Sequence, residues 1–78
     1  MEINVFIQHF TEQFDDVPEV ELLPETNFRE LDEWSSFTAL CVMAMVEEEY
    51  DVQLNAAQMR QATTIQELFD IVKANVND

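Results

Sequence analysis

The chain has 78 residues, 47% of them hydrophobic, and a formal net charge of −14. This length predicts one domain, residues 1–78, with a modest core, and the apolar content is too high for a disordered acidic tail. The charge argues against binding to nucleic acid or to anionic membranes, and it favours partners with basic patches.

Residue usage narrows the fold and the compartment further. The absence of glycine argues against tight β-hairpins, glycine-rich phosphate loops and EF-hand calcium loops. Cys41 is the single cysteine, so no internal disulfide can form, which suits a reducing compartment. Residues 1–10 lack the basic start of a secretory signal, and the apolar run 39–46 is too short to cross a bilayer. We therefore expect a cytoplasmic, membrane-free protein.

The first predicted helix begins near the amino terminus and is closed by residues 15–18, which contain two aspartates and a proline. Spacings of four, three and four place its apolar residues on one face, which Phe6 widens. These residues are Ile3, Ile7, Phe10 and Phe14.

A long irregular connection follows, from about residue 15 to residue 34. Loops of this length are unusual in a small domain and are often functional. Its apolar residues are expected to hold it against the core; they are Val20, Leu22, Leu23, Phe28 and Leu31.

The second predicted helix runs from about Ser36 to Tyr50 and carries two stripes. We expect the first to face the core: Ala39, Met43, Val46 and Tyr50. The second begins at a serine, ends in acids and is a candidate binding surface: Ser36, Phe37, Leu40, Ala44 and Glu47 or Glu48.

Two shorter segments complete the chain. Asn55 is placed to cap a short helix from Ala56 to about Arg60, and Thr64 with Glu67 has capping-box spacing before a last helix. The predicted fold is all-α, a small antiparallel four-helix bundle of three main helices and one short helix, with the long loop between helices 1 and 2.

Self-contained chemistry has little support in this sequence. His9 is the single histidine, and neither Ser36 nor Cys41 has the base and orienting group that a nucleophile needs. The acids at 30–33 and 47–49 lack the spacing of an EF-hand, so a solvated acidic face is favoured over a metal site. We expect neither an enzyme nor a metal-binding protein.

The two serines at the start of the second helix are the remaining candidates. Ser35 can cap the helix, which leaves the hydroxyl of Ser36 free at the first helical position. Backbone N–H groups there lack intrahelical partners and favour a phosphate group. Ser36 is therefore a candidate acceptor, although both serines could equally be capping residues only.

The segment FRELDEWSSFTALCVMAMVEEEYDVQL resembles the prosthetic-group region of acyl carrier proteins. Phe28 and Leu31 match the family's loop positions, residues 47–51 match its helix end, and residues 62–72 are similar to its last helix. In this alignment Ser36 falls on the serine that carries 4′-phosphopantetheine, and Phe37 falls on the leucine that follows it. One departure is that Ser35 replaces the aspartate before that serine, so Ser35 is also a less favoured acceptor.

The resemblance implies a non-catalytic, monomeric carrier that a phosphopantetheinyl transferase modifies with 4′-phosphopantetheine from coenzyme A. Acyl-transferring, condensing or adenylating enzymes with basic patches would dock on Phe37, Leu40, Ala44, Glu47 and Glu48. An acyl pocket would be formed by Phe28, Ala39, Met43, Val46 and Tyr50.

The expected function is transport of acyl groups as thioesters in fatty-acid or polyketide-type biosynthesis. Two alternatives stay open: a discrete peptidyl or aminoacyl carrier, and an unmodified acidic interaction module of the same fold.

Overall fold

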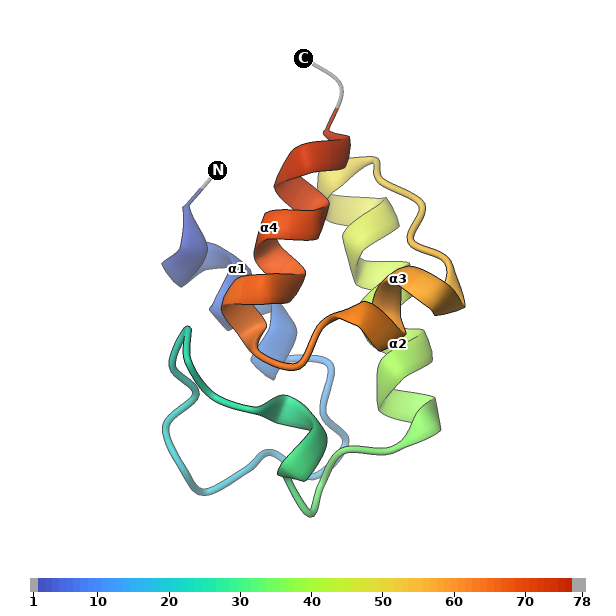
Figure 1. Ribbon diagram of the computed structural model, residues 1–78. Coiled ribbons are helices and arrows are strands. Elements are labelled where there is room, and N and C mark those ends of the chain that lie inside the picture. Colours follow the sequence, from blue (N-terminus) through green and yellow to red (C-terminus); the bar gives the residue numbers. More distant parts are fainter. Residues whose placement is uncertain (1, 77–78) are drawn as a thin grey trace.

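The computed structural model describes residues 2–76, which form four α-helices and one 3₁₀ turn. Helix α1 runs opposite to α2 and α4, and the short α3 lies between α2 and α4 in the chain (Figure 1). The predicted all-α fold class, a small helical bundle, is confirmed. The elements are α1 (Ile3–Thr11), η1 (Phe28–Glu30), α2 (Ser36–Tyr50), α3 (Ala56–Gln61) and α4 (Ile65–Asn75).

Aromatic side chains from several elements form the centre of the core. The ring of Phe6 on α1 lies 5.4 Å from that of Phe69 on α4 and 5.8 Å from that of Tyr50 on α2. Phe10, one turn further along α1, contacts Phe28 of η1 edge-on at 5.4 Å. These contacts join three helices and the loop in one cluster, and burial of large aromatic rings dominates the energetics of so small a core.

Helix α1 is shorter than its apolar spacing predicts. It ends at Thr11, whose hydroxyl donates to the carbonyl of Ile7 at 2.8 Å, and Phe14 lies in a tighter turn beyond it. Phe6, Phe10 and Phe14 are buried, whereas Ile3 is only half-buried. The predicted extension towards residue 15 was wrong, because a turn places Phe14 in the core without a helix.

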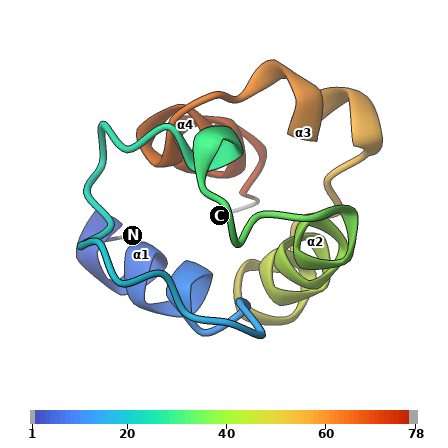
Figure 2. The same ribbon diagram turned by 90° about the horizontal axis from the view of Figure 1, so that it is seen from below.

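The long loop is held to the bundle mainly by its second half. The carbonyls of Pro24 and Thr26 accept hydrogen bonds from the first amides of α4, at 2.8 and 3.2 Å. Figure 2 shows the loop crossing the lower ends of the helices, with η1 beside the start of α4. Leu22 and Phe28 are buried as predicted, but Val20 and Leu23 are exposed, so their predicted anchoring role was wrong. This part of the loop is instead held to the bundle by the backbone hydrogen bonds of Pro24 and Thr26 with α4.

The predicted caps of α3 and α4 are both confirmed. Asn55 and Gln58 form a capping box on α3, and Thr64 and Glu67 form another on α4. Each box satisfies amide groups that have no partner within the helix. Within residues 2–76, no helix is both long and apolar enough to cross a membrane.

Candidate functional site

The two serines at the start of α2 are in different structural states. Ser35 is the N-cap, with extended backbone, and its Oγ accepts a hydrogen bond from the amide of Thr38 at 3.2 Å. The Thr38 hydroxyl lies 3.1 Å from the same oxygen, and Thr38 is only 2% exposed. Ser36 is the first residue of the helix and is exposed. Among the described residues, no hydrogen bond occupies its hydroxyl.

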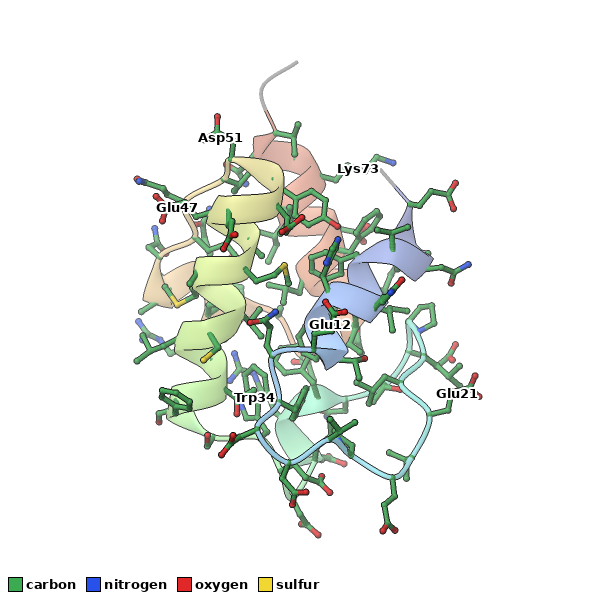
Figure 3. All side chains as sticks on the ribbon, turned by 180° about the vertical axis from the view of Figure 1, so that it is seen from behind. Glu12, Glu21, Trp34, Glu47, Asp51 and Lys73 are labelled. Atoms are coloured by element: carbon green, nitrogen blue, oxygen red, sulfur yellow. The ribbon has the colours of Figure 1, made fainter. Side chains whose placement is uncertain are left out.

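Trp34 fixes the position of this serine pair. Its ring stacks on Phe10 with an interplanar angle of 6°, and it meets Phe28 edge-on with the ring centroids 4.7 Å apart. Figure 3 shows Trp34 between the first turns of α2 and the long loop. Because this anchor immediately precedes Ser35, the start of α2 is held rigidly to the core.

The electrostatics of this helix start suit a phosphate group. The first turn of α2 contains no acidic side chain, and a 15-residue helix directs its positive end and its unpaired amides there. A phosphate ester on the Ser36 hydroxyl would therefore lie in solvent beside the positive end of the helix. The residues present fit a phosphopantetheine attachment site at Ser36 without rearrangement.

The stripe predicted as a docking surface is exposed throughout. Phe37 and Leu40 are 64% and 63% exposed, and Ala44, Glu47 and Glu48 are also exposed. Apolar side chains exposed to this degree and followed by acids are typical of an interaction surface. Thr38 takes no part in it, because its side chain is buried against the cap.

The buried stripe of α2 differs from the predicted one. The buried residues are Thr38, Val42, Met45 and Val46. Only Val46 belongs to the predicted core stripe; its other three members are half-buried. The predicted stripe therefore does face the core, with Val46 buried in it and Ala39, Met43 and Tyr50 packed against it as half-buried side chains.

A pocket of about 360 Å³ opens between α2, α3 and the loop. From α2 it is lined by Ser36, Ala39, Leu40 and Met43. The facing wall contains Met59 and Arg60 of α3. The candidate acceptor serine thus lies directly on the wall of an apolar cavity.

Two of the five residues predicted to form an acyl pocket line this cavity, and three do not. Ala39 and Met43 contribute to its wall, whereas Phe28 and Val46 are fully buried in the core. Tyr50 is at the far end of α2, where burial first, and then the Glu49 carboxylate, raises the pKa of its hydroxyl. The Tyr50 hydroxyl is therefore neutral at physiological pH.

Sequence reasoning missed the arginines of this pocket. Arg29 lines it together with Arg60, and its guanidinium donates through Nε to the carbonyl of Ala62 at 2.8 Å and through Nη2 to that of Met59. These bonds tie the loop to the end of α3. The sequence feature that could have drawn attention to them is that the chain contains only three basic residues.

His9 has a structural environment in this fold. Its Nδ1 lies 3.6 Å from Glu12 and its Nε2 lies 3.7 Å from Glu49, so it connects α1 with the end of α2. Ser36 is at the start of α2, whereas His9 lies beside Glu49 at the end of that helix, so the two residues are remote from each other. In the part of the chain that the structure describes, no three His, Cys, Asp or Glu side chains are arranged to hold a metal ion.

Comparison with known proteins identifies the family. A search of curated proteins and a search of solved structures each returned no match. The family model described as "phosphopantetheine attachment site" matches residues 6–72, which include the loop, both serines, α2, α3 and most of α4. Members of this family bind 4′-phosphopantetheine covalently and act as carriers that interact with modifying and biosynthetic enzymes. The chain belongs to the phosphopantetheine attachment site family and is a carrier protein.

Proposed function

We propose that Ser36 is the attachment residue and that the protein carries acyl groups as thioesters in fatty-acid or polyketide-type biosynthesis. One observation supports this assignment above the others. The Ser36 hydroxyl is exposed at the first position of α2, while the neighbouring Ser35 hydroxyl is engaged by Thr38. Both serines are exposed, but only the Ser36 hydroxyl is free of hydrogen bonds within the described residues, so it is the one available to react with another enzyme's substrate.

In the modification step, the Ser36 oxygen attacks the β-phosphorus of coenzyme A. A serine–phosphate ester would form, the pyrophosphate bond of the coenzyme would break with release of 3′,5′-adenosine diphosphate, and the hydroxyl proton would be lost to the transferase. The bound group supplies a terminal thiol that holds the acyl chain. Cys41 is not this thiol, because it lies half-buried in the middle of α2.

The docking surface is proposed to be the stripe from Phe37 to Glu48. Phe37 and Leu40 would supply apolar contact area close to Ser36, and Glu47 and Glu48 would be read by basic patches on the partner. The proposed partners are a phosphopantetheinyl transferase and acyl-transferring, condensing or adenylating enzymes. The single-domain, monomeric and cytoplasmic assignments stay predictions from the sequence.

The substitution of Ser35 for the family's aspartate favours one alternative, an unmodified interaction module. Intact mass before and after incubation with coenzyme A and a broad-specificity transferase separates the two. We expect one phosphopantetheine to be added to the wild type and to Ser35→Asp, which keeps a capping side chain but removes the hydroxyl. We expect no addition to Ser36→Ala.

Three other outcomes would overturn this assignment. Loading of Ser36→Ala but not of Ser35→Asp would make Ser35 the acceptor. A folded wild type that no transferase modifies would be an interaction module. If the modified protein accepts an aminoacyl group from an amino-acid-adenylating enzyme and accepts no acyl group, it is a peptidyl or aminoacyl carrier.

A further inference from the structure

Two of the three basic side chains of this acidic protein face the same cavity. The chain contains 17 acidic and three basic residues, and Arg29 and Arg60 both line the pocket that Ser36 also lines. No aspartate or glutamate lines this pocket, and the first turn of α2 carries no acid. In a chain with a net charge of −14, two cations without an anion around one cavity indicate a site for an anion.

Neither arginine is neutralised by a carboxylate of the protein itself. Among residues 2–76, both ion pairs involve His9, so no carboxylate oxygen lies within 4.0 Å of either guanidinium group. Arg29 and Arg60 are both exposed, which leaves them open to an anion that arrives from solvent or from a neighbouring residue.

The two arginines come from different elements, and Arg29 is held in a fixed orientation. Its Nε donates to the carbonyl of Ala62 at 2.8 Å, its Nη2 donates to that of Met59, and its guanidinium carbon lies 5.4 Å from the centroid of the Phe28 ring. These bonds use two of five N–H donors, so donors remain for an anion. Arg60 extends from the last turn of α3, a helix of only six residues.

An anion attached to Ser36 would complete this arrangement. A phosphodiester keeps one negative charge at neutral pH, and guanidinium groups bind phosphate oxygens through charge-assisted hydrogen bonds. Ser36 begins α2, Arg29 belongs to η1 in the long loop, and Arg60 belongs to α3. One phosphate bound by both arginines would therefore link three elements of the fold.

We infer that Arg29 and Arg60 form a clamp for the phosphodiester of the attached arm, so that modification of Ser36 ties the loop and α3 to the start of α2. This inference rests on the proposed function, because it requires attachment at Ser36. The clamp makes modification a change in the fold's stability as well as in its chemistry. A partner that contacts α3 can then distinguish the modified protein from the unmodified one.

The sign of the stability change on modification separates this clamp from general electrostatics. Without a cationic partner, the phosphodiester would add one negative charge to a net charge of −14 and lower the melting temperature by repulsion. We instead expect modification to raise the melting temperature of the wild type by about 4 °C at low salt, the effect of two partly exposed ion pairs in a domain of this size. Intact mass verifies loading, and a phosphate-free buffer prevents competition for the arginines.

Arg60→Gln should abolish this rise, and modification should then lower the melting temperature. Arg60→Lys, which keeps the charge, should retain part of the rise. Lys73→Gln is the matched control and should keep all of it, because it removes the same charge from an exposed residue in the last turn of α4. Figure 3 shows Lys73 at the upper end of the molecule and Trp34, which lines the pocket, in the lower half.

Phosphorus NMR of the modified protein tests whether the arginines act on the phosphate itself. The resonance of the phosphodiester should move in Arg60→Gln and stay in place in Lys73→Gln. The Nε–H resonances of Arg29 and Arg60 should shift when the unacylated arm is attached.

Two results would overturn the clamp while leaving the proposed function intact. One is a rise in melting temperature that Arg60→Gln leaves unchanged, which would assign the stabilisation to other contacts of the arm. The other is a loaded protein whose melting temperature does not rise and whose phosphorus resonance does not respond to Arg60. Failure of every transferase to load Ser36 is a different result, since it would overturn the proposed function and the clamp together.

Discussion

At the scale of single residues, the adjacent serines show how one position along a helix start changes the role of the same side chain. Ser35 has extended backbone, so its oxygen faces the amide of Thr38, whereas Ser36 has already entered the helix. The hydroxyl that stabilises the helix is thus occupied, and the one that follows is not. Ser35 thus caps the helix, and the neighbouring Ser36 is left free for the proposed modification.

This division predicts that alanine substitutions at the two serines change the free energy of unfolding by different amounts. Ser35→Ala removes the cap and should lower the free energy of unfolding by about 1 kcal/mol, which lowers the melting temperature by about 4–8 °C in a domain of this size. Ser35→Asp should restore most of that loss. Ser36→Ala should change the stability by less than about 0.5 kcal/mol. Thermal unfolding followed by circular dichroism checks this, and equal losses in both alanine variants would contradict the assignment of the cap.

The proposed docking surface on α2 can be tested against a similarly exposed apolar residue elsewhere on the molecule. Phe37 and Val20 are similarly exposed, at 64% and 59%, but Phe37 lies on α2 beside Ser36 and Val20 lies on the loop. Phe37→Ala should lower the kcat/KM of phosphopantetheine transfer about ten-fold, since truncation of an aromatic anchor typically costs more than 1 kcal/mol. Val20→Ala should leave that rate unchanged. Equal effects of the two variants would show that the surface of α2 has no special role.

At the scale of elements, the capping box of α4 couples helix stability to pH. Glu67 accepts hydrogen bonds from the amides of Thr64 and Thr63, both at 2.9 Å, and these bonds lower the pKa of its carboxyl below the ordinary value of 4.5. A carboxyl whose pKa is lower in the folded state stabilises the fold above the ordinary pKa, and this contribution disappears as pH falls through the lowered value.

Comparison of the wild type with Glu67→Gln isolates this effect. The melting temperature of the wild type should exceed that of the variant by a constant amount above about pH 5, and the difference should shrink steadily as the pH falls below about 4. The comparison with the variant is needed because the chain contains many other acidic side chains besides Glu67. A difference that is independent of pH would mean that the charge of Glu67 contributes nothing to the cap.

The elements were predictable from the sequence to different degrees, for physical reasons. Caps are local, so the starts of α2, α3 and α4 follow from Ser35, Asn55 and Thr64 and their neighbours. The end of α1 and the depth of burial along α2 depend on packing against other elements, so apolar spacing extended α1 too far and did not single out Val42 and Met45 as buried residues. Arg29 donates hydrogen bonds to the carbonyls of Met59 and Ala62, 30 and 33 positions away at the end of α3, and no local pattern predicts such contacts.

The same limit applies to the candidate site. Ser36 and the exposed stripe could be predicted, because both are properties of one helix and its start. The pocket could not, because its walls come from the loop, α2 and α3 together. Of the five residues predicted to form an acyl pocket, only Ala39 and Met43 line this cavity.

At the scale of the whole molecule, the dominant feature is unbalanced negative charge. With a net charge of −14 in 78 residues, and with ion pairs in the described part of the chain confined to His9, carboxylates repel one another across the surface. The same field attracts basic partners from a distance, which raises association rates at low salt. The same charge that would speed docking to basic partners is therefore expected to oppose the stability of the fold.

Screening should therefore stabilise the fold. Raising the ionic strength from about 0.01 M to about 0.15 M shortens the Debye length from about 30 Å to about 8 Å, which is less than the 20 Å of the molecule's smallest dimension. We expect the melting temperature to rise over this range with sodium chloride, and to rise further with magnesium chloride at equal ionic strength because divalent ions associate with neighbouring carboxylates. Under the same conditions the rate of phosphopantetheine transfer should fall, since screening weakens the attraction of the basic transferase. A melting temperature that does not change with salt would show that charge repulsion does not limit the stability of this fold, and the acidic surface would then have to be explained by partner recognition alone.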